Sequence, residues 1–272
     1  MAPHTRAVGG HAEGFGATER TDSWMPLPVV TAVVFLTFIV YTTWAALQGE
    51  HYAWGPYLSP FYSPLLWTTD PAAMHHSWFG AWPSWWPSFI PASPAVLILI
   101  FPGSFRFTCY YYRKAYYRSV AGSPPGCSVG PLASSRPYKG ETFLLIFQNL
   151  HRYAMYFALL FVVFLSYDAL VSFFNEGHFG VGVGSIILTI NAVLLAAYCF
   201  GCHSFRHMIG GRTDCMSCGK MTLKYGAWKK ATWFNELHQE FAWLSLVWVM
   251  ITDVYIRLLS MGVIHDPNTW GL

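Results

Sequence analysis

The chain has 272 residues, of which 54% are hydrophobic, 18% aromatic and only 11% charged, and its mean hydropathy is +0.35. Soluble domains carry about 25% charged residues, so this composition excludes an ordinary soluble domain and indicates a membrane protein. The formal net charge of +3 is too small to suggest binding to nucleic acid.

The amino-terminal stretch, residues 1–24, is polar and rich in glycine. It lacks the short apolar core and the small-residue cleavage site of a secretory signal peptide. We therefore expect it to form a mobile cytoplasmic tail, and we expect the first apolar run to remain as a membrane anchor. Residues 25–272 are then expected to form a single transmembrane domain.

Five stretches approach the roughly 20 apolar residues that a helix needs to cross a bilayer. They are residues 26–47, 91–112, 143–174, 184–208 and 233–261. Pro102, Gly103 and Arg106 interrupt the second stretch, so we expect it to be kinked or partly interfacial. The predicted fold class is an all-α integral membrane protein, a bundle of about five transmembrane helices. The segment Gly49–Ser93, rich in Trp, Pro and Tyr, suits a loop at the membrane interface.

Lys and Arg favour the cytoplasmic side of a membrane, and they are unevenly distributed between the loops of this chain. The segments Gly49–Ser93 and Asn175–Val183 contain none. The loop between the second and third spans and the turn between the fourth and fifth hold Arg113, Lys114, Arg118, Arg136, Lys139, Arg206, Arg212, Lys220, Lys224, Lys229 and Lys230. The amino terminus and both basic loops are therefore expected to be cytoplasmic, in a multi-pass protein of the cell membrane.

The stretch Cys199–Lys220, "CFGCHSFRHMIGGRTDCMSCGK", contains four of the six cysteines and two of the eleven histidines. Its first five residues have the C-x-x-C-H spacing of a covalently attached c-type haem, but such haems are attached on the outer face, opposite the predicted location. Structural disulfides are disfavoured because cytoplasmic thiols are kept reduced. A metal site is the main functional interpretation that remains.

Zinc is one candidate metal for this stretch. Two C-x-x-C pairs, Cys199 with Cys202 and Cys215 with Cys218, could close a tetrahedral site that staples the turn. Gly201 would let the first pair leave helical geometry. This interpretation assigns no role to His203 and His207, the two histidines of the stretch.

A [2Fe–2S] cluster is the alternative that uses the histidines. Residues four apart share a helix face, and Gly210 and Gly211 would let the chain turn back toward the second C-x-x-C pair. Two imidazoles and two thiolates form the ligand set of a Rieske-type centre. The predicted ligands are His203, His207, Cys215 and Cys218, and either Cys199 or Cys202 could replace one of the four. The usual Rieske sequence boxes are absent, so this prediction depends on ligand types alone.

Other ionisable residues are expected at the same depth. His151 and Arg152 precede the apolar core of the third span, and Glu236, His238 and Glu240 precede that of the fifth. Ionisable groups inside a membrane mark functional sites, although snorkelling explains Arg152 and Glu236 nearly as well. His151 and His238 could instead be axial ligands of a b-type haem between helices.

A second group of charged residues is expected near the outer face. Asp253 and Arg257 lie four residues apart and can neutralise each other on one helix face. Asp168 lies at a matching depth in the third span, where it either joins this pair or belongs to a proton path.

The sequences "GCHSFRHMIGGRTDCMSCGK" and "FQNLHRYAMYFALL", in a chain with these spans, resemble a known family. The chain is similar to the cytochrome b-like, SdhC-type membrane anchor of an actinobacterial or mycobacterial succinate dehydrogenase. The resemblance implies a flavoprotein subunit that oxidises succinate, an iron–sulfur subunit docked on the anchor, and quinone reduction near the cytoplasmic face. A further small membrane subunit is compatible with it. Many relatives hold b haems by four intramembrane histidines, whereas here the histidines crowd toward one face and cysteines accompany them.

The resulting hypothesis is electron relay from the docked subunit through a Rieske-like [2Fe–2S] cluster to menaquinone. His151 and Arg152 would hydrogen-bond the quinone oxygens, because a positive or proton-bearing group stabilises developing negative charge. Tyr153 and Trp233 would be walls of the pocket, and His238 would relay protons. An anchor with haem b and a zinc-stapled membrane scaffold are the alternatives. The isolated chain is expected to be a subunit of an enzyme rather than an enzyme by itself.

Overall fold

The computed structural model describes residues 15–132, 142–211, 215 and 222–271. Its internal contacts group the chain into two compact units. The first unit comprises residues 1–37 and 107–149, and the second comprises residues 38–106 and 150–272. The second unit contains every side chain of the candidate site described below. Residues outside the described ranges include several basic residues of the predicted cytoplasmic loops and Cys218.

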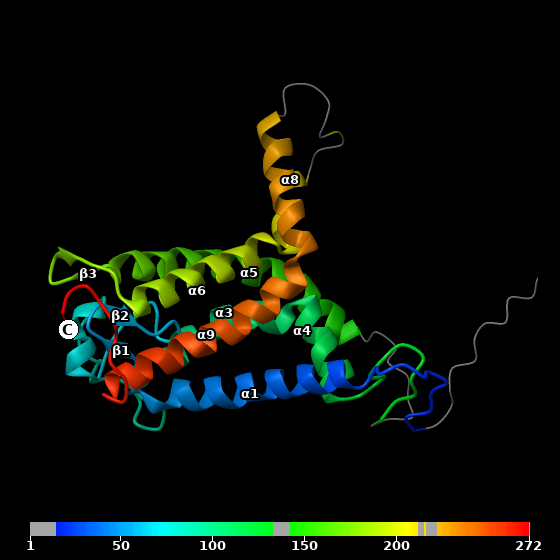
Figure 1. The fold of residues 1–272 in the computed structure, drawn as a ribbon, viewed down its shortest axis with the longest axis horizontal. Coiled ribbons are helices and arrows are strands. Elements are labelled where there is room, and N and C mark those ends of the chain that lie inside the picture. The colour runs from blue at the N-terminus through cyan, green and yellow to red at the C-terminus, as the bar shows by residue number, and fades with distance from the viewer. Residues whose placement is uncertain (1–14, 133–141, 212–214, 216–221, 272) are drawn as a thin grey trace, which may run out of the picture. The chain divides into compact units, whose positions relative to one another are not determined.

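Four helices in the described part of the chain are long and apolar enough to cross a membrane. They are α1 (Pro26–Gln48), the Asn149–Val171 portion of α5 (Thr142–Val171), α6 (Val183–Phe200) and α9 (His238–Ser260). These helices are shown in Figure 1. The predicted all-α membrane fold is thus confirmed, with four full-length spans where the sequence indicated about five.

The second predicted span, residues 91–112, is divided into short helices. It consists of α2 (Pro94–Ile98), α3 (Ile100–Thr108) and α4 (Tyr110–Lys114), and the chain continues into η2 (Ala115–Val120). Proline has no N–H and its ring clashes with the carbonyl four residues earlier. Pro102 stands four residues after Ile98, which is where α2 ends. The predicted kink is therefore present, and its cause is local.

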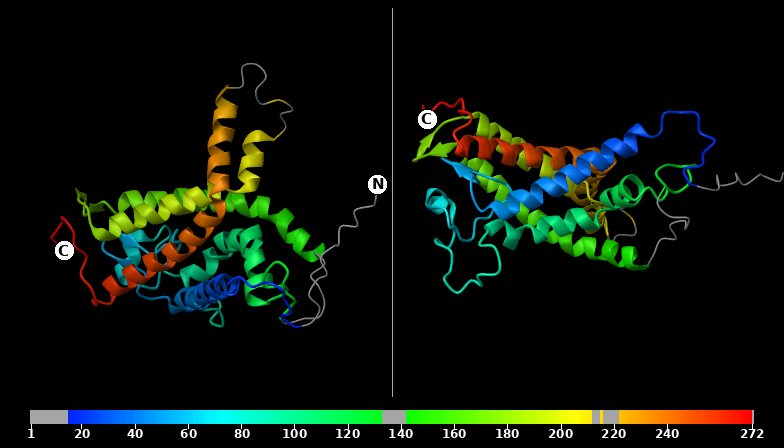
Figure 2. Two further views of the ribbon diagram at one scale, coloured as in Figure 1. Left: turned by 45° about the vertical axis from the view of Figure 1, so that its right-hand side comes forward. Right: turned by 90° about the horizontal axis from the view of Figure 1, so that it is seen from below.

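The fourth and fifth predicted spans are each interrupted as well. The helix α6 stops at Phe200 and α7 (His203–Gly210) follows it, while α8 (Thr222–Glu236) precedes α9. At the two interruptions, Cys202 has an extended backbone (ψ 135°) and Leu237 leaves the helical region (ψ 15°). The helices α7 and α8 lie side by side and project away from α6 and α9 (Figures 1 and 2). We call this part of the second unit the hairpin end.

The opposite end of the second unit, the loop end, carries two small antiparallel hairpins and the helical turn η1 (Pro71–His76). Strands β1 (Ala53–Trp54) and β2 (Tyr57–Leu58) form one hairpin, and β3 (Phe174–Asn175) and β4 (His178–Phe179) form the other. Glu176 and Gly177 in the second turn have φ of +50° and +83°. Positive φ at both central residues is the geometry of a two-residue hairpin turn.

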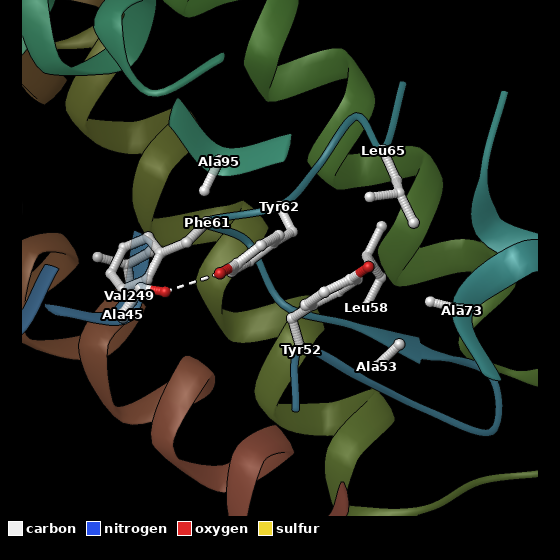
Figure 3. Close-up of a cluster of buried hydrophobic side chains, with 10 residues drawn as sticks. All are labelled: Ala45, Tyr52, Ala53, Leu58, Phe61, Tyr62, Leu65, Ala73, Ala95 and Val249. Atoms are coloured by element: carbon white, nitrogen blue, oxygen red, sulfur yellow. Dashed lines mark hydrogen bonds between the residues drawn. The ribbon is translucent and has the colours of Figure 1, made fainter. Parts of the chain in front are cut away.

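One buried cluster lies at the loop end and is formed largely by non-helical chain (Figure 3). Its residues are Ala45, Tyr52, Ala53, Leu58, Phe61, Tyr62, Leu65, Ala73, Ala95 and Val249. The rings of Tyr52 and Tyr62 stack at 4.1 Å, and the Tyr62 hydroxyl donates to the Ala45 carbonyl at 2.7 Å. Much of the predicted interfacial loop is therefore core, while Trp85 and Phe89 are 70% and 85% exposed.

A second buried cluster joins the spans of the same unit. It consists of Tyr57, Ala169, Leu188, Ala192, Ile256 and Leu259, which come from β2, α5, α6 and α9. Small residues at Ala169 and Ala192 let the helices approach closely, as is typical of membrane helix packing. In the first unit, Phe35 of α1 contacts the rings of Tyr112 and Tyr116, with centroids 6.2 and 5.9 Å away.

Candidate functional site

Two helix breaks face each other at the hairpin end and form the frame of the candidate site. Gly201 and Cys202 separate α6 from α7, and Leu237 separates α8 from α9. The Asn235 side-chain amide donates to the Gly201 carbonyl at 2.7 Å. A Cβ on Gly201 would lie 2.6 Å from the Phe234 carbonyl oxygen, so only glycine fits this approach. The sequence thus brings Cys202, in the first break, and His238, directly after the second, into the same region.

A buried sulfur meets an imidazole beside these breaks. His151 Nε2 of α5 lies 3.1 Å from Cys202 Sγ. Cys202 and Cys199 are 1% and 3% exposed, and neither forms a disulfide. His238 is also buried and is close enough to His151 for the two imidazoles to interact electrostatically. Two cysteines and two histidines from α5, α6 and α9 therefore gather around one region.

Aromatic rings hold both imidazoles in place. The His151 ring stacks on Phe105 of α3, with centroids 4.6 Å apart and planes at 11°. The His238 ring stacks on Tyr198 of α6, with centroids 5.0 Å apart and planes at 9°. Phe105 and Tyr198 contact each other at 5.1 Å. Such contacts restrict the imidazole rotamers and exclude water from their faces.

Arg106 completes the wall of the site next to Phe105. Its guanidinium donates to the Ala242 carbonyl at 3.2 Å and to the Ser245 hydroxyl at 3.0 Å, both on α9. Its central carbon also lies 4.9 Å from the centroid of the Tyr198 ring. The positive charge interacts electrostatically with Cys199, the residue that follows Tyr198.

The ligands that the sequence analysis put first are placed differently. His203 and His207 are both exposed on α7, and Arg152 Nη2 donates to His207 Nδ1 at 2.6 Å. Cys215 is disulfide-bonded, which the sequence argument had disfavoured, and Cys218 lies outside the described residues. Over the described ranges, no three His, Cys, Asp or Glu side chains come together closely enough to hold a metal ion. The ligand set therefore stays a prediction.

The residues predicted to contact quinone differ in how far they are exposed. His151 points toward Cys202, whereas its neighbours Arg152 and Tyr153 are directed to the surface, with Tyr153 64% exposed. Trp233 on α8 is 54% exposed. The carboxylates Glu236 and Glu240, which flank buried His238 in sequence, are exposed.

Comparison with known proteins identifies the family of this chain. The family model for the actinobacterial succinate dehydrogenase subunit SdhC matches residues 26–262. The chain belongs to this SdhC family. A chain of the solved "Mycobacterium smegmatis Sdh1 complex in the apo form" is 42% identical to it, with a TM-score of 0.80 and 92% of each chain covered. A search of curated proteins found no match.

Membership of the SdhC family confirms the predicted class of protein. The chain is the membrane subunit of a succinate dehydrogenase and therefore works with partner subunits in a bacterial inner membrane. Four helices in the described part of the chain are long enough to cross the bilayer, as expected of a multi-pass membrane protein.

The sequence analysis missed several residues of the SdhC site. Phe105, Tyr198 and Asn235 carried no signal, because aromatic and amide side chains are common throughout the chain. Arg106 did carry one, since an arginine in an apolar segment is costly and marks a functional position. From the sequence, however, Arg106 supports only the prediction that the second span is kinked or partly interfacial.

The predicted ion pair at the loop end of this SdhC chain is confirmed. Arg257 Nε donates to Asp253 Oδ2 at 2.7 Å, and both side chains are buried. Tyr41 donates to the same carboxylate at 2.5 Å, and Ser59 donates to its other oxygen. Asp168 does not appear among these contacts and instead accepts a hydrogen bond from Ser63.

Proposed function

We propose that this SdhC chain relays electrons from a docked iron–sulfur subunit to menaquinone, in a complex whose flavoprotein subunit oxidises succinate. The observation that supports the proposal best is the contact between His151 Nε2 and Cys202 Sγ at paired helix breaks. An imidazole from α5 and a thiol from the break after α6 meet there, next to a second buried cysteine, Cys199, and the buried His238. Metal ligands from separate helices are a common way to build a cofactor site inside a bundle.

The proposed cofactor is a Rieske-like [2Fe–2S] cluster. Besides the predicted ligands His203, His207, Cys215 and Cys218, a second candidate set is His151, His238, Cys199 and Cys202, although no three of these four side chains come together closely enough to hold an ion in the structure. Two imidazoles and two thiolates are the donor types of such a cluster. In such a cluster the two imidazoles would bind one iron and the two thiolates the other, whereas His151 Nε2 and Cys202 Sγ lie in hydrogen-bonding contact at 3.1 Å. The earlier set depended on His203 and His207, which are exposed on α7.

When bound, such a cluster would accept and donate one electron at a time. The residues of the chain provide its environment. Phe105 and Tyr198 fix the imidazole planes, and Asn235 ties the two helix breaks together. Burial of Cys199 and Cys202 keeps bulk water from their sulfurs. Outer contacts of this kind orient ligands and tune the potential of a metal site.

Quinone binding is assigned to the adjacent surface around Arg152. This guanidinium lies beside His151 in sequence and contacts His207 of α7 at 2.6 Å. A positive charge there would stabilise the negative charge that develops on a quinone oxygen as it is reduced. The exposed ring of Tyr153 follows Arg152 in sequence and is available as an apolar wall. Trp233 of α8 stays a second candidate wall.

A b-type haem is the second candidate for the cofactor. His151 and His238 lie on α5 and α9 and interact electrostatically, so they could act as a pair of axial ligands. That assignment gives Cys199 and Cys202 no role, although both thiols are buried beside the histidines. Zinc held by cysteines is the third outcome and would make the chain a scaffold.

Metal analysis and EPR of the purified intact complex test the proposal. We expect iron and a rhombic signal of low average g that disappears in Cys202→Ser and His238→Gln. The variant Cys127→Ser, at an exposed free thiol of the first unit, is the matched control and should keep the signal. His203→Gln with His207→Gln should also keep it. A Soret band that depends on His151, or zinc without iron, would refute the cluster assignment.

A further inference from the structure

The hairpin of α7 and α8 begins and ends where the apolar spans of the second unit end. The apolar part of α5 begins at Asn149, that of α6 ends at Phe200 and that of α9 begins at His238. Between the last two points the chain does not continue along the spans but projects away from them (Figures 1 and 2). Arg152, in the first turn of the α5 span, contacts His207 of α7 at 2.6 Å. Because three apolar spans end here, the hairpin lies at the level where lipid headgroups surround the bundle.

One side of α8 is turned back toward the spans. The Phe234 ring marks this side, because its centroid lies 6.4 Å from that of Phe200 on α6 and 6.0 Å from that of Phe241 on α9. Leu223 and Lys230 precede Phe234 by eleven and four residues, so they lie on the same side of the helix. Leu223 is 90% exposed, and Lys230 is exposed as well. We call the side with Leu223 and Lys230 the overhang face, since it extends beyond the packed bundle toward the surrounding lipid.

The other two sides of α8 have different surroundings. One side packs on α7, where Arg206 Nε donates to Thr232 Oγ1 at 3.0 Å. The remaining side carries Tyr225 and Lys229, both exposed, with Lys229 Nζ 5.6 Å from the centroid of the Tyr225 ring. Tyr225 is two residues from Leu223, which places the two side chains about 160° apart around the helix. The polar side of α8 is therefore directed away from the overhang face.

The composition of the hairpin favours lipid as the occupant of the overhang face. The two helices contain one acidic residue, Glu236, and four Lys or Arg residues, Arg206, Lys224, Lys229 and Lys230. A basic helix with one apolar side is typical of interfacial helices that bind anionic lipids. Leucine gains free energy by leaving water, and a neighbouring lysine can bury its stem and extend its ammonium group to a phosphate. An acidic protein surface would match the charges alone, whereas an anionic lipid matches the charges and the exposed leucine together.

We propose that the overhang face of α8 is a binding site for an anionic phospholipid of the adjacent leaflet. Leu223 enters the apolar boundary of the bilayer, and the Lys230 ammonium group binds the phosphate of the lipid. The basic residues of the hairpin indicate that this leaflet is the cytoplasmic one. A bound lipid holds α8 against the membrane and so supports the contact between the two helix breaks, at Gly201 and Leu237. This inference goes beyond the proposed function and requires no cofactor.

A fluorescent probe on α8 tests whether lipid covers the overhang face. Leu223→Cys is labelled with bimane in the intact complex that also carries Cys127→Ser, which removes an exposed thiol, and the complex is reconstituted into phosphatidylcholine nanodiscs. Phosphatidylcholine with brominated chains should quench this probe strongly, whereas aqueous iodide should not. The matched control is Tyr225→Cys in the same background, which should show the reverse. Quenching of both probes by iodide alone, or a Leu223 probe that neither agent reaches because a protein covers it, would refute the proposal. The Cys127→Ser complex, treated with bimane in parallel, supplies the background signal.

A charge series tests the role assigned to Lys230. Brominated phosphatidylglycerol should quench the probe at Leu223→Cys at lower mole fractions than brominated phosphatidylcholine. Lys230→Gln should weaken the relative association of phosphatidylglycerol about fivefold, which corresponds to about 1 kcal/mol for one charge near the surface, and Lys230→Arg should retain it. Lys224→Gln is the matched control and should have a smaller effect, because Lys224 Nζ donates to the Gly211 carbonyl at 3.3 Å, between the two helices. If Lys230→Gln changes nothing, or if Lys224→Gln weakens the association equally, Lys230 does not bind the phosphate. None of these readouts involves iron, so they decide this inference separately from the proposed function.

Discussion

Gly201 lies at the end of α6, close to the end of α8 and the start of α9. A methyl group on it would lie 2.6 Å from the Phe234 carbonyl oxygen and 3.0 Å from His238 Nδ1. Neither contact can relax easily, because one partner is backbone and the other belongs to a stacked imidazole. The residue between Cys199 and Cys202 therefore controls how closely the two helix breaks approach.

We predict that Gly201→Ala destabilises the complex and displaces His238 from the site, since overpacking in a tight site typically costs about 1–3 kcal/mol. Gly226→Ala in α8 is the matched control, because no atom lies within 4 Å of its added Cβ. It should be neutral or stabilising by up to about 1 kcal/mol, as alanine favours helix more than glycine does. Thermal unfolding of the purified complex measures both. Equal unfolding temperatures for the two variants would contradict the prediction.

At the scale of elements, the turn η1 is tied to the β1–β2 hairpin by a pair of histidines. His75 Nε2 and His76 Nε2 lie 3.0 and 3.1 Å from the Gly55 carbonyl oxygen. Burial, and then the neighbouring His75, lower the pKa of His76 to about 4 from an ordinary value of 6.5. The folded protein therefore holds His76 neutral under conditions in which the unfolded chain would protonate it.

This lowered pKa predicts a pH-dependent contribution to stability. Between pH 6.5 and about pH 4 the unfolded state binds more protons than the folded state, so stability falls as the pH falls. The contribution of His76 is fully present above pH 6.5. His76→Gln should reduce the loss of unfolding temperature between pH 7 and pH 5, whereas His178→Gln, on the exposed strand β4, should leave it as in the wild type. Parallel pH profiles for wild type and His76→Gln would exclude this contribution.

At the scale of the second unit, the carboxylate of Asp253 joins three separate parts of the chain. It accepts hydrogen bonds from Tyr41 of α1, from Ser59 of the buried loop and from Arg257 of α9. Arg257 in turn donates to the carbonyls of Ala45 and Glu50 at 3.0 and 2.9 Å. The loop end is therefore assembled around one buried ion pair, as the hairpin end is assembled around two helix breaks.

We predict that Asp253→Asn costs about 3–5 kcal/mol of stability, because it leaves a buried guanidinium without its counter-charge. The double variant Asp253→Asn with Arg257→Leu should lose less than Asp253→Asn alone, since neither charge then remains buried. Asp22→Asn breaks the exposed pair with Arg20 and should not change the unfolding temperature measurably. If the double variant is less stable than the single one, the hydrogen bonds of Arg257 contribute more than the charge balance does.

Local features of the sequence were sufficient for much of the fold. Apolar length placed α1 within one residue of its observed end, Pro102 explained the broken second span, and spacing of four residues paired Asp253 with Arg257. Each of these depends on neighbouring residues in one segment. The ends of the fourth and fifth spans could not be placed in this way, because the helix breaks at Gly201 and Leu237 are stabilised by contacts between them.

By itself, the sequence determined that this is an all-α membrane protein of the SdhC type, and it predicted sulfur and nitrogen ligands near one turn. Composition, apolar length and motif content are properties of the linear chain, so they can be recognised without a structure. Only the tertiary structure decided which of the candidate side chains meet. It directs His203 and His207 to the surface and places His151 against Cys202 from a span 51 residues away. The reason is geometric: two facing helix breaks turn α7 and α8 out of the bundle, and no spacing rule within one segment encodes that turn.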